Sequence, residues 1–420
     1  MKKILIHCGF SPFDNPTTRD LIKRKVKIGD NTGNFLFPNS LMRTFLDQDT
    51  VIVPNYYHFD YSDAEIEKLN AEYQMFLLPL ADAFRAGNEF MLKGLTALIR
   101  KLKIPCVVVG VGLRAPYKQE LEVYPFDDCV RDFVRAVLER SAILGLRGRF
   151  TGKYLEQLGF APEKDFTVIG CPSLYTYGGG LQIRDPAKDV QHLSVNANTL
   201  EPDEVSEFIN RCMDGIPDVT VVQQKYSEVS AVFLGGDHKN VYREGRYQQL
   251  IAEDRIRYFC SVPAWINYMK GIDLCVSSRF HGMVSAILAG TPSVIIPFDS
   301  RTRELAEYHN LTRISLDVLK KGTNPETLLA KADFRAPMKV SEENYSHYLW
   351  FLSQNGLKPA FSEDTASVYD KKAAKITWYQ QEPNYVNSFV AERISRKIDC
   401  FCGKAVNKAN QLIKRKEELL

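Results

Sequence analysis

Short apolar runs, rich in β-branched residues, alternate with segments of helical periodicity along most of this 420-residue chain. Strands that lie parallel in one sheet need a crossover connection, which is usually a helix, so the alternation predicts an α/β fold with parallel sheets. Runs such as Met75–Leu78 are apolar throughout, as expected for strands buried on both faces. The first half of the chain is predicted to hold strands near 3–8, 51–53, 74–79, 104–110, 143–146 and 166–170.

Three consecutive glycines at 178–180 separate this series from a second one. Glycines give a linker conformational freedom, so we place a domain boundary there. The second series predicts strands near 192–196, 218–223, 256–260, 272–276 and 293–297, and helices near 202–213, 263–270, 281–289 and 301–309. We therefore expect two Rossmann-like domains that face a cleft (a GT-B-like arrangement), at 1–178 and 179–355, with a C-terminal helical extension over 356–420.

The charge of the chain is small and unevenly placed. The formal net charge is +3, and residues 391–420 carry eight Lys/Arg against four Asp/Glu, so the rest of the chain is nearly neutral. No basic stripe interleaved with aromatic residues occurs in the body, and we expect no nucleic-acid partner. The tail has apolar residues at helical spacing. It would either brace the two domains or, through 386–420, make a peripheral contact with an anionic membrane.

The cysteines and the hydropathy indicate the cellular compartment in which such a chain would function. Nine cysteines are scattered without paired CxxC spacing, mostly in apolar runs, which is typical of a reducing cytosol. The apolar stretch after Met1 ends at His7, and no stretch approaches the roughly 18 apolar residues of a membrane span. A cytoplasmic location, peripheral at most to a membrane, is expected. The remaining histidines share no metal-binding spacing, so we expect no metal.

The segment 278–282, with the sequence Ser-Arg-Phe-His-Gly, joins a buried strand to a helix. Ligands of open α/β sheets bind at the carboxyl ends of strands, where a helix start offers free N–H groups. Arg279 adds a fork of donors suited to phosphate or carboxylate, and His281 can move a proton near neutral pH. The alternative is that Ser278 caps the helix while Arg279 and His281 form structural hydrogen bonds; the strand-end position favours a functional site.

The stretch from Asp273 to Asp299, with Arg-x-His-Gly followed by Ala-Gly-Thr-Pro and Pro-Phe-Asp, resembles the signature of the polysaccharide pyruvyl transferase family. The block that begins Gly-Leu-Arg147 is similar to a second family segment, and Gly-Asp-Asn31 resembles a third. Together the three blocks cover most of residues 1–310. The chain departs from the family pattern at Cys171, where the family often has aspartate, and at Arg301, near which it has lysine.

The resemblance implies transfer of a pyruvyl unit from phosphoenolpyruvate to two hydroxyls of a sugar in a polysaccharide or lipid-linked glycan precursor. The product would be a cyclic pyruvate ketal, with phosphate released and no cofactor beyond the donor. Such a donor carries a phosphate and a carboxylate, so at least two cations should hold it. Arg147 and Arg279 match the family's positions for this task, Ser278 lies beside them, and His281 is assigned the acid–base role by resemblance and by chemistry.

Further residues are weaker candidates. Arg301 and Arg303, just past the next strand end, would close on the phosphate or would equally well be solvated residues of a helix start. Asn31 and His58 are guesses for the acceptor sugar, from a set of polar and aromatic residues at strand ends that are individually more often structural.

Two other functions fit the same sequence. A nucleotide-sugar glycosyltransferase of the GT-B type would use a similar cleft, arginine and helix dipole, but no clear carboxylate for ribose hydroxyls occurs in the second half, and the glycine runs complete no nucleotide motif. A non-catalytic glycan-binding protein would keep the fold alone. Retention of Arg147, Arg279 and His281 argues against that reading, because a disused site has no physical reason to keep these charges.

Overall fold

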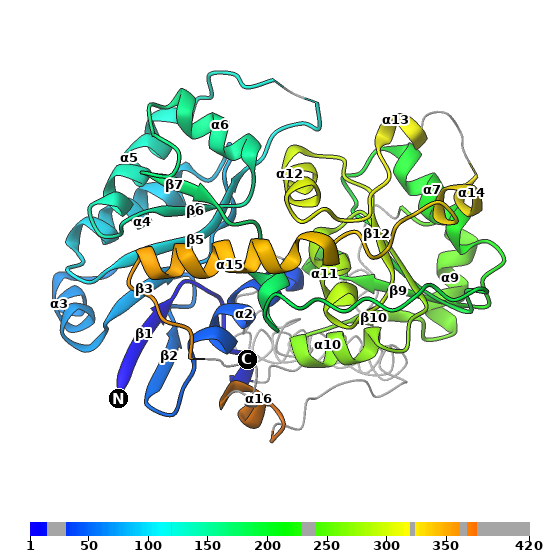
Figure 1. Cartoon of the computed structure of the whole chain (residues 1–420), viewed down its shortest axis with the longest axis horizontal. Helices are drawn as coiled ribbons and strands as arrows, with labels where there is room; N and C mark the ends of the chain where they lie inside the picture. The colour runs from blue at the N-terminus through cyan, green and yellow to red at the C-terminus, as the bar shows by residue number, and fades with distance from the viewer. Residues whose placement is uncertain (15–30, 119, 229–240, 320–323, 361–367, 376–420) are drawn as a thin grey trace, which may run out of the picture.

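The computed structural model describes residues 1–14, 31–118, 120–228, 241–319, 324–360 and 368–375. Two parallel sheets stand side by side, and each has helices on both faces (Figure 1). This is the α/β architecture with two Rossmann-like domains that the alternation of strands and helices predicts.

The first sheet has the strand order β2-β1-β3-β5-β6-β7, and every pair in it is parallel. Its strands are β1 (Lys2–Ile6), β2 (Thr50–Pro54), β3 (Met75–Leu78), β4 (Ala81–Phe84), β5 (Cys106–Leu113), β6 (Leu144–Leu146) and β7 (Phe166–Val168). The sequence predicts all of these except β4, which pairs with the end of β5. That short segment carries a charged residue, Asp82, and so shows no clear strand pattern.

Neighbouring residues of the first sheet face different sets of helices, as the two-residue period of a strand requires. Leu78 and Val108 pack in one core, and Leu77 and Val107 in another. The first core is covered by α3 (Asp63–Glu72), α4 (Glu89–Lys101), α5 (Asp127–Leu138) and α6 (Arg149–Gln157), and the second by α2 (Leu36–Phe45) and α15 (Met338–Gln354).

The second sheet has the order β10-β9-β8-β11-β12, again with every pair parallel. The strands are β8 (His192–Asn196), β9 (Asp218–Gln223), β10 (Ile256–Tyr258), β11 (Leu274–Ser277) and β12 (Ser293–Ile295). Helices α7 (Asp203–Met213), α9 (Glu244–Ala252), α13 (Leu316–Leu319) and α14 (Pro325–Leu329) lie on one face, and α10 (Val262–Met269), α11 (Phe280–Leu288) and α12 (Ser300–Tyr308) on the other. The winding reverses between β8 and β11, the point at which open α/β sheets have a ligand-binding crevice at the carboxyl ends of their strands.

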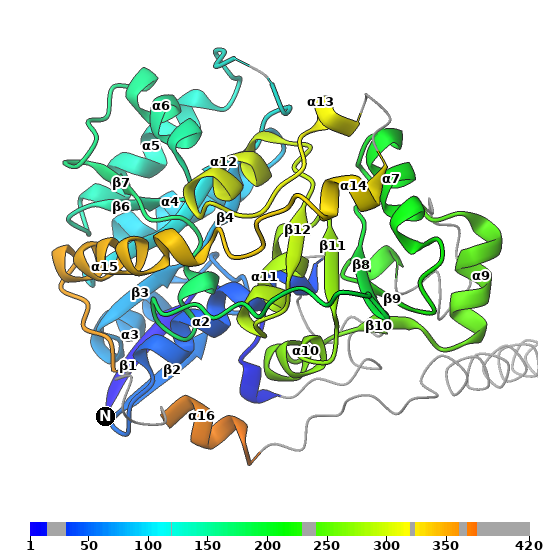
Figure 2. The ribbon, with the colours of Figure 1, turned by 45° about the vertical axis from the view of Figure 1, so that its right-hand side comes forward.

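Helix α15 returns from the second domain to the first. Its buried side chains Tyr348, Phe351 and Leu352 share a core with Ile6 and Leu41, and Figures 1 and 2 show it lying across the first sheet. The helix follows the second sheet in sequence and lies within the predicted range 179–355, but it packs on the first sheet.

Helix α16 (Val368–Ala373) extends the same packing. Arg43 of α2 donates to both oxygens of Asp370, at 3.0 and 2.7 Å, and to the carbonyl of Thr176. The sequence shows no periodicity in this region, because one short turn of helix is too brief to produce it.

The glycines at 178–180 do more than loosen a linker. A Cβ atom on Gly179 would lie 2.9 Å from Cβ of Tyr345 and 3.1 Å from Cα of Glu342, so a larger residue would collide with α15. Gly178 has a φ of +89°, which L-residues rarely adopt. The prediction of free backbone is therefore wrong at Gly179, where close packing is the physical reason for glycine.

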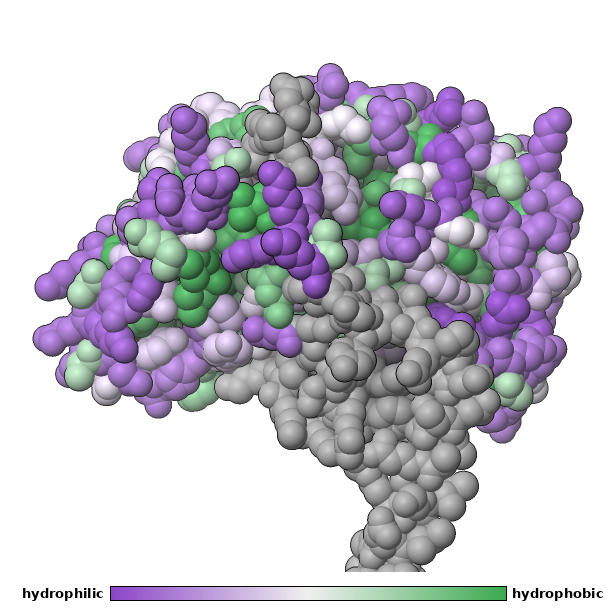
Figure 3. Space-filling model, turned by 90° about the horizontal axis from the view of Figure 1, so that it is seen from below, coloured by the Kyte–Doolittle hydropathy of each residue, from purple (hydrophilic) through white to green (hydrophobic). Residues whose placement is uncertain are grey.

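The basic tail segment 386–420 lies outside the described residues, so its brace and membrane roles stay predictions. Within the described part of the chain, no helix combines the length and apolar character needed to cross a membrane. Seen from below, hydrophobic side chains form small patches between hydrophilic ones on the coloured part of the surface (Figure 3).

Candidate active site

The two domains meet where the chain leaves β5 and β12. Ser300, at the start of α12, donates its N–H to the carbonyl of Ala115 at 3.0 Å, and its hydroxyl accepts from the N–H of Ala115 at 2.9 Å. Pro116 and Asp299 form an isolated bridge beside them. These contacts bring strand ends of both sheets to the same region.

His281 and Arg147 approach one thiol from opposite domains. His281 is in the first turn of α11 and is partly exposed. Its Nε2 lies 3.9 Å from Sγ of Cys171, and Nη2 of Arg147, which follows β6, lies 3.9 Å from the same sulfur. The structure therefore brings together these two residues predicted from sequence, and it adds Cys171, which the sequence noted only as a departure from the family pattern.

The imidazole of His281 is held in its neutral form. Burial lowers the pKa of His281 well below its usual value, and the positive charges of Arg147 and Arg301 lower it further. A neutral imidazole carries one accepting and one donating nitrogen, so near pH 7 it can take a proton from a hydroxyl. The geometry thus places a base beside fixed cations.

Arg147 is fixed along its stem. Its Nε donates to the carbonyl of Gly110 at 3.1 Å, and its guanidinium lies over the ring of Phe37 at 4.8 Å. A Cβ on Gly112 would lie 3.5 Å from Cβ and Cδ of Arg147. That distance is an ordinary packing contact, and the arginine is closely packed, because only 3% of the residue is exposed.

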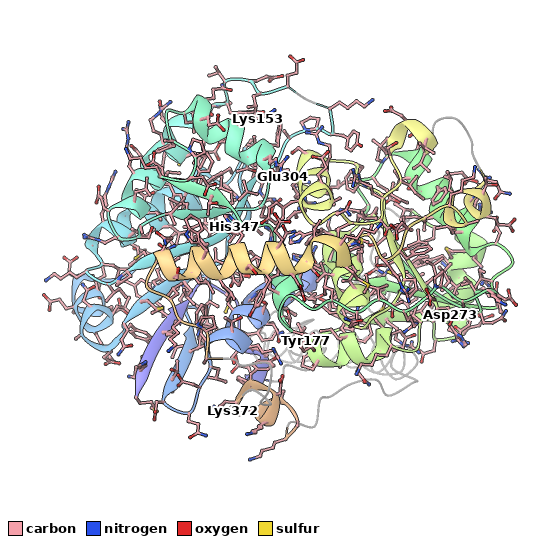
Figure 4. All side chains as sticks on the ribbon, viewed as in Figure 1. Lys153, Tyr177, Asp273, Glu304, His347 and Lys372 are labelled. Carbon is pink, nitrogen blue, oxygen red and sulfur yellow. The ribbon has the colours of Figure 1, made fainter. Side chains whose placement is uncertain are left out.

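A carboxyl from the second domain caps a helix of the first. Glu304 of α12 accepts from the N–H and the hydroxyl of Thr151, at 2.9 and 2.8 Å, and so satisfies the start of α6. Burial raises the pKa of Glu304 to about 7. Figure 4 shows Glu304 where α12 faces the first domain. Sequence reasoning missed this residue because its partner is 153 positions away.

A second group of charges surrounds Asp82 of β4. Its Oδ2 lies 3.0 Å from Nη1 of Arg301, 3.1 Å from Nη1 of Arg85 and 3.7 Å from Nη1 of Arg114. Burial raises the pKa of Asp82, but the charges of these three arginines and of Arg147 outweigh it, and the net direction is downward. Arg301 was a predicted site residue, whereas the sequence gave no sign of Asp82 or Arg85.

Arg279 and Ser278 directly follow β11, beside the carboxyl end of β8, and both are buried. Arg279 is only 5% exposed; it donates from Nε to the carbonyl of Ala197 at 2.6 Å and forms an ion pair with Glu228. Its Nη1 is buried and has no partner among the described residues. The sequence did not foresee the Glu228 carboxylate.

The alternative in which Ser278 caps α11 is wrong. Arg279 is the N-cap residue of that helix, and it makes no side-chain cap. The hydroxyl of Ser278 instead bonds to the carboxylate of Glu201 and accepts from the N–H of Asn198 at 2.9 Å.

Arg303 points away from the Asp82 group. It donates to the carbonyl of Tyr117, and its guanidinium lies over the rings of Tyr117 and Phe150, at 5.5 and 5.3 Å. These contacts hold α12 against the first domain. The structure therefore separates Arg303 from Arg301, although the two are adjacent on the sequence-predicted helix start.

The two acceptor guesses fall in different places. Asn31 accepts from the N–H of Gly33 at 2.7 Å, and a Cβ on Gly33 would lie 2.9 Å from both Oδ1 of Asn31 and Cβ of His281. Asn31 is thus a neighbour of the site. His58 packs its ring edge-on against Tyr61 at 4.4 Å, and no contact within the described residues links it to His281.

Two further observations bound the chemistry. In the described part of the chain, no group of three or more His, Cys, Asp or Glu side chains is arranged to hold a metal ion. A cavity of about 660 Å³ opens at the amino ends of the second sheet, beside Asp273 and Leu274. Figure 4 shows Asp273 far from Glu304, and the lining of this cavity includes neither His281 nor Arg147.

Solved structures resemble the chain only in outline. The UDP-GlcNAc 2-epimerase of Methanocaldococcus jannaschii, in complex with UDP-GlcNAc and UDP, is 10% identical over 84% of this chain and 100% of its own, with a TM-score of 0.46. The corresponding Neisseria meningitidis enzyme bound to UDP-GlcNAc is 10% identical over 84% and 100%, at 0.41. An E. coli heptosyltransferase is 10% identical over 83% and 99%, at 0.26. No curated protein matches the sequence.

A family model gives the firm assignment. The model described as polysaccharide pyruvyl transferase matches residues 31–300, which is more than half of the chain. The matched region includes Arg147, Arg279 and His281. The chain belongs to the polysaccharide pyruvyl transferase family.

Proposed function

We propose that the protein transfers a pyruvyl group from phosphoenolpyruvate to two hydroxyls of a sugar in a polysaccharide or lipid-linked glycan precursor, forming a cyclic ketal and releasing phosphate. Family membership supports the reaction class. The observation that carries the proposal is the meeting of His281 and Arg147 from opposite domains, with Arg301 close enough to lower the histidine pKa. A neutral base beside several cations suits an anionic donor.

The donor has two anionic groups, and preorganised cations stabilise such charges best in a site shielded from water. We assign Arg147 and Arg301 to the donor, with Arg279 and Ser278 in the adjoining crevice. The buried Nη1 of Arg279, unpaired among the described residues, supports a ligand contact at that position. Arg303 is a weaker assignment, because Tyr117 and Phe150 already engage it.

The reaction balances with one proton carrier. His281 takes the proton of the first sugar hydroxyl as its oxygen bonds to C2 of the donor, and the imidazolium gives that proton to the methylene carbon, which becomes a methyl group. The second hydroxyl then attacks C2, the C–O bond to phosphate breaks, and its proton leaves with the phosphate. Phosphoenolpyruvate and a diol thus yield the ketal and inorganic phosphate, with no redox change and no cofactor.

The acceptor sugar would lie on the side of the first domain. Asn31 is a neighbour of His281 through Gly33 and can bond a sugar hydroxyl there. His58 is the weaker acceptor assignment, since its contact with Tyr61 does not lead to the site.

Phosphate release tests the function. Purified protein is incubated with phosphoenolpyruvate and a panel of galactose- or mannose-containing acceptors. We expect acceptor-dependent phosphate release by wild type and none by His281→Ala. His192→Ala is the matched control, because His192 is half-exposed and pairs with Asp218 and Asp273 in the second domain. Equal rates in wild type and His281→Ala would remove the catalytic assignment.

The peripheral membrane contact is tested separately. Flotation with anionic liposomes is compared before and after deletion of residues 386–420. Recovery that depends on the tail would support a contact suited to lipid-linked acceptors, whereas equal recovery would end that proposal.

A further inference from the structure

Strand β4 holds an unusual backbone at the carboxyl edge of the first sheet. Its pairing with β5 shifts register between Ala81 and Phe84, and Ala81 has a φ of +47°, in the left-handed region that non-glycine residues rarely enter. Such outliers persist where the surrounding structure imposes them, often at functional sites. Here the distortion sets Asp82 and Arg85 beside Arg114, which follows β5.

The charges in this cluster do not cancel. Arg85, Arg114 and Arg301 surround Asp82, and Arg301 also bonds Asp299 at 3.1 Å. Three cations therefore face two carboxylates, leaving a positive excess. Like charges held together repel one another, and an added anion relieves that repulsion.

The cations are also more accessible than the carboxylate beneath them. The side chains of Arg85, Arg114 and Arg301 are 37%, 31% and 24% exposed, against 15% for Asp82. Asp82 thus ties the guanidinium groups together from below while parts of them remain open to a ligand. A planar guanidinium fork matches the oxygens of a phosphoryl group.

The cluster lies beside the proposed reaction centre. The backbone N–H of Arg147 donates to the carbonyl of Val111 on β5 at 2.9 Å, three residues before Arg114. The charge of Arg301 lowers the pKa of His281, and that of Asp82 raises it. Arg301 comes from α12 of the second domain, whereas the other members come from the first, so the cluster, like the pair of Arg147 and His281, spans the domain contact.

We propose that Arg85, Arg114 and Arg301, held by Asp82, form a phosphoryl-binding subsite next to His281. The proposal rests on the proposed function and deepens it, because it adds two arginines that lie outside the motif blocks. The phosphoryl group belongs either to phosphoenolpyruvate or to the diphosphate of an activated acceptor. Arg114 is the key residue, since within the described residues its only ion pair is the one to Asp82, at 3.7 Å.

The test compares equilibrium binding of phosphoenolpyruvate, pyruvate and inorganic pyrophosphate to wild type and Arg114→Gln, at constant ionic strength. Losing a charged hydrogen bond to phosphate should weaken binding about tenfold or more. A fall for phosphoenolpyruvate with pyruvate unchanged would assign the subsite to the donor. A fall for pyrophosphate with phosphoenolpyruvate unchanged would assign it to the acceptor.

Arg131→Gln is the matched control: its side chain is 30% exposed and pairs with Asp128 on the surface of α5. Arg114→Lys keeps the charge but loses the guanidinium fork, so it should bind the phosphoryl ligand with an affinity between those of wild type and Arg114→Gln. It also provides the test if the glutamine variant does not fold. Phosphoryl affinities within twofold of the control for both variants would overturn the proposal. Arginine-dependent binding without turnover would leave the subsite standing and count against the proposed function alone.

Discussion

The buried carboxyl of Glu304 makes folding stability depend on pH in a way that a single substitution should remove. The pKa of Glu304 rises from 4.5 to about 7 because the residue is buried between α12 and the first domain. One pKa unit corresponds to about 1.4 kcal/mol, so ionising this group in the folded protein costs about 3 kcal/mol relative to the unfolded chain.

The sign follows from the raised pKa. Below pH 4.5 the group is protonated in both states and contributes no difference. As the pH rises towards 7 the unfolded chain ionises first, so wild type loses stability across this window and the loss levels off above it. Glu304→Gln cannot ionise, and its amide can still accept from the N–H of Thr151 and donate to the Thr151 hydroxyl. The variant should exceed wild type by only about 1 kcal/mol at pH 5 and by about 3 kcal/mol at pH 8.

Urea unfolding at pH 5, 6, 7 and 8, followed by fluorescence and circular dichroism, measures the difference. Glu307→Gln is the matched control, because Glu307 lies on the same helix with 55% of its side chain exposed. Parallel pH curves for wild type and Glu304→Gln, or a glutamine variant less stable at pH 8, would refute the reasoning.

Three further predictions concern packing and protonation. Phe351→Ala should lower the free energy of unfolding in urea by about 3–5 kcal/mol, because the ring is fully buried on the first sheet. Trp350→Ala is the control, because Trp350 is 37% exposed on the same helix. A loss below about 1 kcal/mol for Phe351→Ala would contradict the packing. Arg43→Met should free α16 by removing its two bonds to Asp370, seen as faster proteolysis near that residue; unchanged cleavage would speak against the contact. Because the pKa of His281 is lowered, the midpoint of the acid limb in the pH profile of kcat/KM should lie below pH 6.5. A midpoint above pH 6.5 would contradict a neutral base.

Much of the fold is readable from the sequence because parallel strands buried on both faces are continuous apolar runs. β3 and β5 are of this kind, and they were located to within two or three residues. β4 was missed because Asp82 interrupts a segment of only four residues. The packing of helix α15 on the first sheet could not be predicted, because the apolar residues of one helix, such as Phe351, look the same whichever sheet they cover.

The residues of the site also fall into some that the sequence could predict and others that it could not. Arg147 and His281 stand in recognisable motifs at strand ends, so their meeting could be expected. The carboxylates that organise the arginines could not, because their partners are distant in sequence: Asp82 and Arg301 are 219 positions apart, and Glu228 and Arg279 are 51 apart. A single sequence carries no signal for such pairs. Only the folded structure shows that Arg279 pairs with Glu228 and that Arg301 shares the carboxylate of Asp82 with two other arginines.

The central claim is that phosphoenolpyruvate binds between Arg147 and Arg301 with its methylene carbon towards His281. A crystal structure of the protein soaked with phosphoenolpyruvate, with a parallel soak in a nucleoside diphosphate, tests it most directly. We expect the donor's phosphate and carboxylate to lie on these arginines and its methylene carbon to lie within reach of the imidazole. A nucleoside diphosphate bound in the crevice beside Arg279, with no phosphoenolpyruvate near His281 at saturating concentration, would contradict the account and favour a nucleotide-sugar glycosyltransferase.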